Sequence, residues 1–201
     1  MQKREPPIRA VAFGDSLTVG YQSTTSENPA GLFTPYADFL KERLGDRIEI
    51  LTMGVSGELT GEMAMRLQQD VIAHHPDYVV ILGGSNDLGW NARPEAVMRN
   101  LTLLYERCRA AGIQQIPVTV PSILGFDRLI PPRKVLNQMI QEYAQRHQLP
   151  CVDLFTATAD PGTGELLQRY SNDGLHLTTE GYQLLAELLD EEVFRPLISS
   201  I

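Results

Sequence analysis

The sequence predicts an α/β fold in which a parallel sheet is covered by helices on both faces. Two observations support this prediction. Short apolar runs alternate along the chain with segments whose apolar residues recur at helical spacing. The runs are continuously apolar, as in strands that are buried on both faces, and do not alternate between apolar and polar residues. The expected strands are 8–14, 48–53, 78–82, 116–120 and 151–154.

The first strands and the helix between them have clear ends. Residues 8–14 form an apolar run that stops at a glycine. Residues 36–44 carry tyrosine, phenylalanine and leucine at helical spacing, and Gly45 stands where that helix would end. Residues 48–53 form the second apolar run, which stops before Gly54.

The middle of the chain repeats this alternation. Residues 63–72 form an amphipathic pattern that Pro76 prevents from continuing as a helix. Residues 78–82 are continuous and rich in β-branched side chains, which is typical of a buried strand. Pro94 suits the first turn of a helix that we expect to run to about Ala111.

The last part of the chain is expected to complete the sheet. The fourth strand, 116–120, contains Pro117, which favours a position near a sheet edge. A longer loop is expected over 121–132, and a fifth strand over 151–154. Residues 160–164 are rich in turn-forming residues. The remaining expected helices are 135–143 and 178–193.

Length and composition limit the protein class. A chain of 201 residues predicts a single domain, residues 1–201, because domains commonly hold about 150 residues. The composition, 43% hydrophobic and 21% charged, is that of a globular protein and excludes a disordered or collagen-like chain. The 17 basic and 25 acidic residues give a net charge of -8, which disfavours nucleic acid as a partner.

The chain as given carries no secretion or membrane signal that we recognise. The apolar run near the N-terminus is too short for a signal peptide, and no run approaches the roughly 20 residues that span a bilayer. We therefore expect a cytoplasmic protein without stable membrane insertion. Two cysteines, Cys108 and Cys151, cannot form a disulfide framework and are expected to be reduced.

Four clusters of glycine and polar residues follow expected strands or precede the last helix. In parallel sheets, ligands bind outside the carboxyl ends of the strands, so these positions are where chemistry is expected. The clusters are Gly14-Asp-Ser-Leu17, Gly54-Val-Ser-Gly57, Gly84-Ser-Asn-Asp87 and Asp173-Gly-Leu-His176.

Together these clusters supply the groups that acyl transfer requires. A serine hydroxyl such as that of Ser16 is a poor nucleophile and needs an adjacent base. His176 can be that base, and Asp173, three residues earlier, can hold its ring in one tautomer. The backbone amides of Ser16 and Gly57 and the carboxamide of Asn86 can stabilise the oxyanion of a tetrahedral intermediate.

The four clusters, beginning with Phe13-Gly-Asp-Ser-Leu-Thr18, resemble the four sequence blocks of the SGNH, or GDSL, hydrolases and occur in the same order. The resemblance implies that Ser16 is the nucleophile and an oxyanion donor, Gly57 and Asn86 are further donors, and His176 is the base oriented by Asp173. It also implies a flavodoxin-like α/β/α sandwich with five parallel strands. Asp15 and Asp87 are expected to cap nearby backbone N–H groups.

The substrate pocket should be built from loops at the same edge of the sheet. The apolar candidates near the four clusters are Tyr21, Leu88, Trp90, Leu124, Phe126 and Leu175. An apolar lining favours uncharged acyl chains over sugars. The stretch 22–28 and the loop 121–132 are candidates for mobile covers of the pocket.

We therefore predict a serine carboxylic-ester hydrolase that forms an acyl-enzyme with small or short-to-medium acyl esters, lysophospholipids and thioesters included. Two alternatives stay open: a carbohydrate O-deacetylase or acyltransferase that uses the same site, and a non-catalytic lipid- or glycan-binding module. No cofactor or metal is expected, because His74, His75 and His147 lack the spacing of a helical metal site. The P-loop, the dinucleotide-binding glycine motif and the Gly-x-Ser-x-Gly elbow are all absent from the sequence. The sequence leaves the oligomeric state open.

Overall fold

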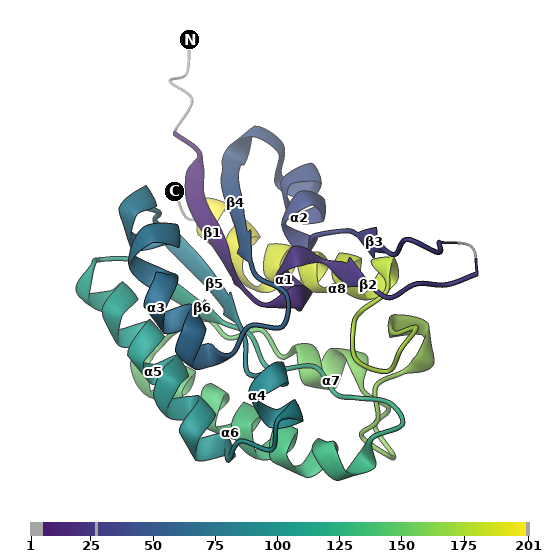
Figure 1. Ribbon diagram of the computed structural model, residues 1–201. Helices are drawn as coiled ribbons and strands as arrows, with labels where there is room; N and C mark the ends of the chain where they lie inside the picture. Colours follow the sequence, from purple (N-terminus) through teal and green to yellow (C-terminus); the bar gives the residue numbers. More distant parts are fainter. Residues whose placement is uncertain (1–5, 27, 200–201) are drawn as a thin grey trace.

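A central parallel sheet separates two layers of helices in the computed structural model, which describes residues 6–26 and 28–199 (Figure 1). The spatial order of the strands is β4, β1, β5 and β6. Their bounds are Ile8–Gly14 for β1, Ile48–Gly54 for β4, Tyr78–Leu82 for β5 and Gln114–Pro117 for β6. All three pairings are parallel, so the predicted α/β/α sandwich is confirmed.

The predicted fifth strand is wrong, because the extended segment there is one residue long. Val152 forms a single parallel bridge with Val118, next to β6. Asp153 already caps helix α7, Leu154–Thr158, and its side chain accepts a hydrogen bond from a backbone N–H of that helix. The sheet of the described residues therefore has four strands, with Val152 in the place of a fifth.

Helices cover both faces of the sheet (Figure 1). Along β1, Ala10 and Ala12 belong to one apolar cluster, while Val11 and Phe13 belong to the other. Successive strand residues point to opposite faces, which explains why apolar residues stand at consecutive positions of β1. The first cluster includes residues of α2 (Tyr36–Leu44) and α8 (Thr179–Leu189), and the second includes residues of α3 (Thr60–Asp70), α5 (Pro94–Ala110) and α6 (Ile130–His147).

Shorter elements connect these layers. The two-stranded antiparallel sheet consists of β2 (Tyr21–Gln22) and β3 (Leu32–Phe33). The short α-helices are α1 (Ser16–Val19), α4 (Ser85–Gly89), α7 and α9 (Arg195–Ser199). The 3-10 helices are Gly45–Arg47, Ile72–His74, Asp127–Leu129 and Gln168–Tyr170, and Asp190–Phe194 forms a π-helix.

Several predicted boundaries differ from the structure. The loop expected over 121–132 ends early, because α6 begins at Ile130 and places two prolines in its first turn, where the missing N–H groups have no helical partner to lose. Strand β6 ends at Pro117, three residues before the predicted end. The last helix was expected to run to residue 193, but α8 ends at Leu189 and continues as a π-helix.

The carboxyl ends of three strands meet at one place. The register pairs Gly14 of β1 with Gly54 of β4 and with Leu82 of β5. A Cβ atom on Gly14 would lie 2.1 Å from the carbonyl oxygen of Leu82, so only glycine fits there. Along the chain β1 is followed by β4, which pairs on one side of β1, and then by β5, which pairs on its other side. The strand order thus reverses direction at β1, and ligands of open α/β sheets bind at such a switch point.

Candidate active site

Ser16 lies directly after β1, at the first position of helix α1. The side chain of Asp15 caps this helix, because its Oδ1 accepts a hydrogen bond from the Leu17 N–H at 2.9 Å. The helix ends after one turn at Gly20, whose φ of 77° lies in the left-handed region. This short, capped turn presents Ser16 at the switch point of the sheet.

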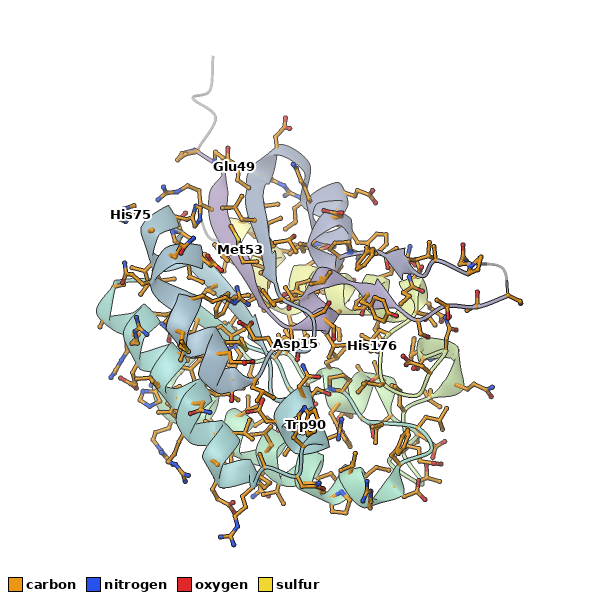
Figure 2. All side chains as sticks on the ribbon, in the orientation of Figure 1. Asp15, Glu49, Met53, His75, Trp90 and His176 are labelled. Carbon is orange, nitrogen blue, oxygen red and sulfur yellow. The ribbon has the colours of Figure 1, made fainter. Side chains whose placement is uncertain are left out.

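His176 joins Ser16 to Asp173, although Ser16 and His176 are 160 residues apart in the sequence. The Nε2 atom of His176 lies 3.1 Å from the Ser16 hydroxyl oxygen, and its Nδ1 atom lies 2.7 Å from Asp173 Oδ2. Both side chains are partly buried, with 18% of His176 and 28% of Asp173 exposed. Figure 2 shows Asp15 and His176 at the same edge of the sheet, whereas His75 lies well away from it.

The loop before α8 holds the Asp173 carboxylate in place. Its Oδ1 atom accepts hydrogen bonds from the backbone N–H groups of Leu175 and His176, each at 2.8 Å. Partial burial raises the pKa of Asp173, but the His176 ring and these two N–H groups outweigh burial and hold the pKa well below its ordinary value. The carboxylate is therefore ionised at neutral pH and can accept a hydrogen bond from the Nδ1–H group of His176.

Tyr21 packs against the imidazole ring of His176. Its ring meets that of His176 edge-on, with the ring centroids 4.7 Å apart and the planes at 82°. The hydroxyl of Tyr182 donates to the Tyr21 carbonyl oxygen at 2.7 Å. Tyr21 was predicted to line the substrate pocket, and the structure places it where it restricts the orientation of His176.

Asn86 links the second and third clusters to the first. Its Nδ2 atom donates to the Glu58 carbonyl oxygen at 2.9 Å and lies 3.4 Å from Asp15 Oδ2. Gly57, just before Glu58, has a φ of 79°, a conformation that favours glycine and turns its backbone. These contacts connect Asn86 to the residue that follows Gly57 and to Asp15, the residue before Ser16.

The two motif aspartates have different roles. Asp15 caps the backbone next to it, as expected. Its complete burial raises the pKa of its carboxyl to about 7, against the opposing effect of the Leu17 N–H. Asp87 also accepts from a backbone N–H, but its partner is Thr60, 27 residues away in the sequence, whose hydroxyl donates to the same carboxylate.

Arg66 and Glu58 support the site and were not identified from the sequence. Arg66 Nε donates to Glu58 Oε1 at 2.7 Å, and its Nη2 atom donates to the Gly14 carbonyl oxygen at 2.9 Å. Its guanidinium also lies 4.3 Å from the centre of the Phe13 ring. In the sequence Arg66 is a charged residue next to the buried Leu67, as is ordinary in an amphipathic helix. Nothing in that pattern distinguished it from a solvent-exposed arginine.

A pocket of about 330 Å³ adjoins this group of residues. Of the predicted lining residues, Trp90, Phe126 and Leu175 do line it. The prediction for Leu88 is wrong, since its side chain is 1% exposed and packs in the core beneath α3, α5 and α6. Leu124 packs against the core on the other face of the sheet. The full lining is Ser85, Asn86, Gly89, Trp90, Ile123, Phe126, Leu129, Arg133 and Leu175.

The remaining histidines lie outside this site. His74 and His75 are exposed at the end of a 3-10 helix, and the His147 ring stacks on Tyr143 with centroids 4.2 Å apart. Over residues 6–26 and 28–199, no three His, Cys, Asp or Glu side chains are grouped so that they could hold a metal ion. In the same part of the chain, no helix is both long and apolar enough to cross a membrane.

The sequence matches the GDSL-like Lipase/Acylhydrolase family over residues 12–184. The chain belongs to this family. The matched range contains Ser16, Gly57, Asn86, Asp173 and His176 and reaches into α8. The family assignment thus agrees with the resemblance read from the four clusters.

Individual relatives agree with this assignment. The chain is 30% identical to the lipase/acylhydrolase from Enterococcus faecalis, whose crystal structure superimposes with a TM-score of 0.74 over 92% of this chain and 95% of that chain. It is 24% identical to the arylesterase of Vibrio mimicus over 200 residues, which cover 94% of this chain and 90% of the relative. The chain is therefore an ester-hydrolysing enzyme, and the alternative of a non-catalytic binding module is set aside.

A third relative is longer than this chain. The uncharacterized lipoprotein YqeF of Bacillus subtilis (strain 168) is 31% identical over 122 residues, which cover 57% of this chain. The match spans 49% of YqeF, so this chain corresponds to about half the length of that relative.

Proposed function

We propose that this enzyme hydrolyses carboxylic esters of small or short-to-medium acyl chains through a covalent acyl-enzyme, with Ser16 as the nucleophile. The observation that supports this proposal is the pair of hydrogen bonds made by His176. Its ring lies 3.1 Å from the Ser16 hydroxyl on one side and 2.7 Å from the Asp173 carboxylate on the other. That is the geometry in which a base activates a serine and a carboxylate orients the base.

The ionised Asp173 fixes the tautomer of the imidazole. A carboxylate accepts hydrogen bonds only, so the short contact requires the proton on Nδ1 and leaves the lone pair of Nε2 facing Ser16. As the Ser16 oxygen attacks the ester carbonyl carbon, its proton passes to His176 Nε2. The imidazolium that forms is stabilised by Asp173.

The tetrahedral intermediate carries a negative oxygen, which the Ser16 and Gly57 backbone N–H groups and the Asn86 carboxamide stabilise. One N–H of the Asn86 carboxamide donates to the Glu58 carbonyl oxygen. The other faces Asp15, with Nδ2 3.4 Å from Asp15 Oδ2, and this long hydrogen bond can be replaced by one to the oxyanion. When the carbon–oxygen bond to the leaving group breaks, the His176 proton moves to the leaving alcohol. Water, deprotonated by the same imidazole, then releases the acid.

The size of the pocket limits the substrate. Its volume of about 330 Å³ is at the small end of ligand pockets, and most of its lining is apolar or aromatic. Trp90 is 80% exposed and Phe126 is 51% exposed, so both present apolar surface to an incoming acyl chain. This lining supports the choice of short-to-medium acyl groups.

The test is a series of aryl esters from acetate to octanoate, hydrolysed by the wild type and by Ser16→Ala. We expect Ser16→Ala to lose at least about 10³-fold in kcat for each ester that the wild type hydrolyses. Ser56→Ala is the matched control, because Ser56 belongs to the second cluster but is exposed and should leave turnover unchanged. If ester turnover is absent, or persists without the Ser16 hydroxyl, the proposal fails.

A further inference from the structure

Arg133, in the first turn of α6, is a buried charge that forms no ion pair with a carboxylate of residues 6–26 or 28–199. Its side chain is 0% exposed and is the largest of the fully buried side chains in the described part of the chain. Its Nη2 atom donates to the Ser85 hydroxyl at 3.1 Å, and its Nη1 atom donates to the Leu129 carbonyl oxygen at a long 3.3 Å. Its Nε atom has no hydrogen-bond partner among the described residues.

This arrangement is costly for folding. A buried charge is normally paired, because removing an ion from water is compensated only by a close counter-charge with good hydrogen bonds. Burial lowers the pKa of the Arg133 guanidinium to about 10, so the group still carries its positive charge at neutral pH. Nothing in the proposed catalytic steps uses this charge.

Arg133 lies in the wall of the pocket that adjoins the proposed catalytic residues. The same pocket is lined by Asn86, a proposed oxyanion donor, and by Leu175, the residue before His176. Every other residue of its lining is uncharged. A negative group of a substrate in this pocket would meet one positive charge and no carboxylate.

We propose that Arg133 is a specificity-determining residue that binds an anionic oxygen group, carboxylate or phosphate, of the ester substrate. The guanidinium has N–H donors to spare, that of Nε among them, and its planar arrangement of donors suits two oxygens of one anion. The anion would complete the hydrogen bonding that the protein leaves open. This inference rests on the proposed esterase function and deepens it, since it names the charge of the preferred substrate.

The anionic group can belong to the acyl part or to the alcohol part of the ester, and two pairs of substrates separate these sources. The acyl arm compares aryl half-esters of glutarate and adipate with the same compounds whose free carboxyl is capped as a methyl ester. The alcohol arm compares butyryl glycerol 3-phosphate with butyryl glycerol. Within each pair the measured quantity is the ratio of kcat/KM for the anionic and the neutral substrate.

We expect this ratio to be about tenfold or more in one arm for the wild type, because hydrogen bonds between charged groups are the strong ones. Arg133→Met should lower the ratio of kcat/KM to one or below. Arg133→Lys should retain part of the preference for the anionic substrate. Arg128→Met is the matched control: it removes the same charge from an exposed side chain of the adjoining 3-10 helix and should keep the wild-type ratio.

A purely structural role of Arg133, in which it only orients Ser85, predicts a different result. Both members of a pair would then slow equally in Arg133→Met, and the ratio would not change. The inference is overturned by that result, or by a wild-type ratio of one or less in both arms. If neutral esters are turned over with Ser16 dependence while no anionic preference exists, the esterase proposal stands and this inference alone fails.

A binding measurement keeps the test independent of turnover and of the Arg133 variants. Titration calorimetry of Ser16→Ala measures affinity without hydrolysis, for the adipate half-ester and its methyl-capped form and for butyryl glycerol 3-phosphate and butyryl glycerol. In one of the two pairs we expect the anionic form to bind about tenfold tighter, with a difference that shrinks in high salt. Equal affinities for the two forms of the acyl pair and of the phosphate pair would overturn the inference even if the enzyme proved inactive on every ester.

Discussion

The carboxylate of Asp87 accepts two hydrogen bonds from Thr60, one from the backbone N–H at 3.0 Å and one from the hydroxyl at 2.8 Å. Both residues are buried, with Thr60 fully inaccessible and Asp87 6% exposed. The pair ties the first residue of α3 to α4, the short helix that carries Asn86. It therefore fixes the distance between the second and third clusters of the site.

Removing the Asp87 carboxylate should destabilise the protein. Asp87→Ala leaves the Thr60 N–H and hydroxyl without this acceptor in a buried place, and we expect a loss of about 2–4 kcal/mol in the free energy of unfolding. Asp87→Asn keeps one acceptor oxygen and should cost about half as much. Urea denaturation measures both, with the exposed Asp127→Ala as control. A cost below 1 kcal/mol for Asp87→Ala would contradict the assigned role.

Arg66 and Glu58 should show strong energetic coupling. The Glu58 side chain is 6% exposed and that of Arg66 is 16% exposed, so removing one partner leaves a poorly solvated charge. We expect Arg66→Met to cost about 3–5 kcal/mol, and the double variant with Glu58→Gln to cost less than the sum of the two single variants. Since the Glu58 carbonyl also holds Asn86, kcat should fall more than KM rises. Additive costs in a double-mutant cycle would refute the pairing.

The fold and the positions of the proposed catalytic residues could be predicted because they depend on local sequence features. Strands buried on both faces must be apolar throughout, and Gly14 is required where β1 approaches β5 closely. Glycines stand at the ends of β1 and β4 and directly after β5, and three of the four clusters lie at these strand ends. Ser16 and His176 could therefore be predicted as neighbours across 160 residues.

The remaining features depend on contacts between segments that no local pattern encodes. Asp87 could have capped its own turn, and only the packing of α3 gives it Thr60 as partner. Arginine is rarely fully buried, so nothing in the sequence indicated that Arg133 would be. The expected strand near Val152 is reduced to one bridge, because the cap formed by Asp153 starts a helix at once.

Replacing Asp173 by asparagine should abolish most activity without unfolding the protein. The asparagine amide would present a donor to His176 Nδ1, which favours the tautomer with its proton on Nε2, facing Ser16. We expect kcat to fall by about 10³–10⁴-fold with little change in KM. Glu180→Gln, an exposed carboxylate of α8, is the control and should keep wild-type kinetics. A loss of less than tenfold would show that Asp173 does not set the tautomer.

Trp90 should determine how well longer acyl chains bind. Its ring is 80% exposed and lines the pocket, so Trp90→Ala removes apolar surface from the mouth and leaves the hydrogen bonds of His176 in place. We expect KM for aryl octanoate to rise several-fold, while KM for the acetate changes little, because each buried methylene contributes about 0.8 kcal/mol. Met65→Ala, 84% exposed on α3 and absent from the pocket lining, is the control. Equal effects on acetate and octanoate would contradict an acyl-binding role for Trp90.

Asp15 should make the folded protein less stable as the pH rises from about 4 to 7. Burial raises the pKa of its carboxyl from 3.8 to about 7, with His176 lowering it and Asp87 and Glu58 raising it further by smaller amounts. Between these two values the folded state binds a proton that the unfolded state has released, so stability falls with rising pH. Asp173 has the opposite effect on stability at lower pH. Folding depresses its pKa, so its contribution to the free energy of unfolding is lost as the pH falls below 3.8.

The substitution Asp15→Asn removes the titration of this buried carboxyl and keeps an acceptor for the Leu17 N–H. We expect the free energy of unfolding of the variant to be flatter than that of the wild type between pH 4 and pH 7, with a gain on the order of a few kcal/mol at pH 7. Urea denaturation at half-unit pH intervals and constant ionic strength measures this slope. Asp127→Asn, an exposed carboxyl, should leave it unchanged. A variant with the wild-type slope would show that Asp15 stays ionised in the folded protein throughout this range.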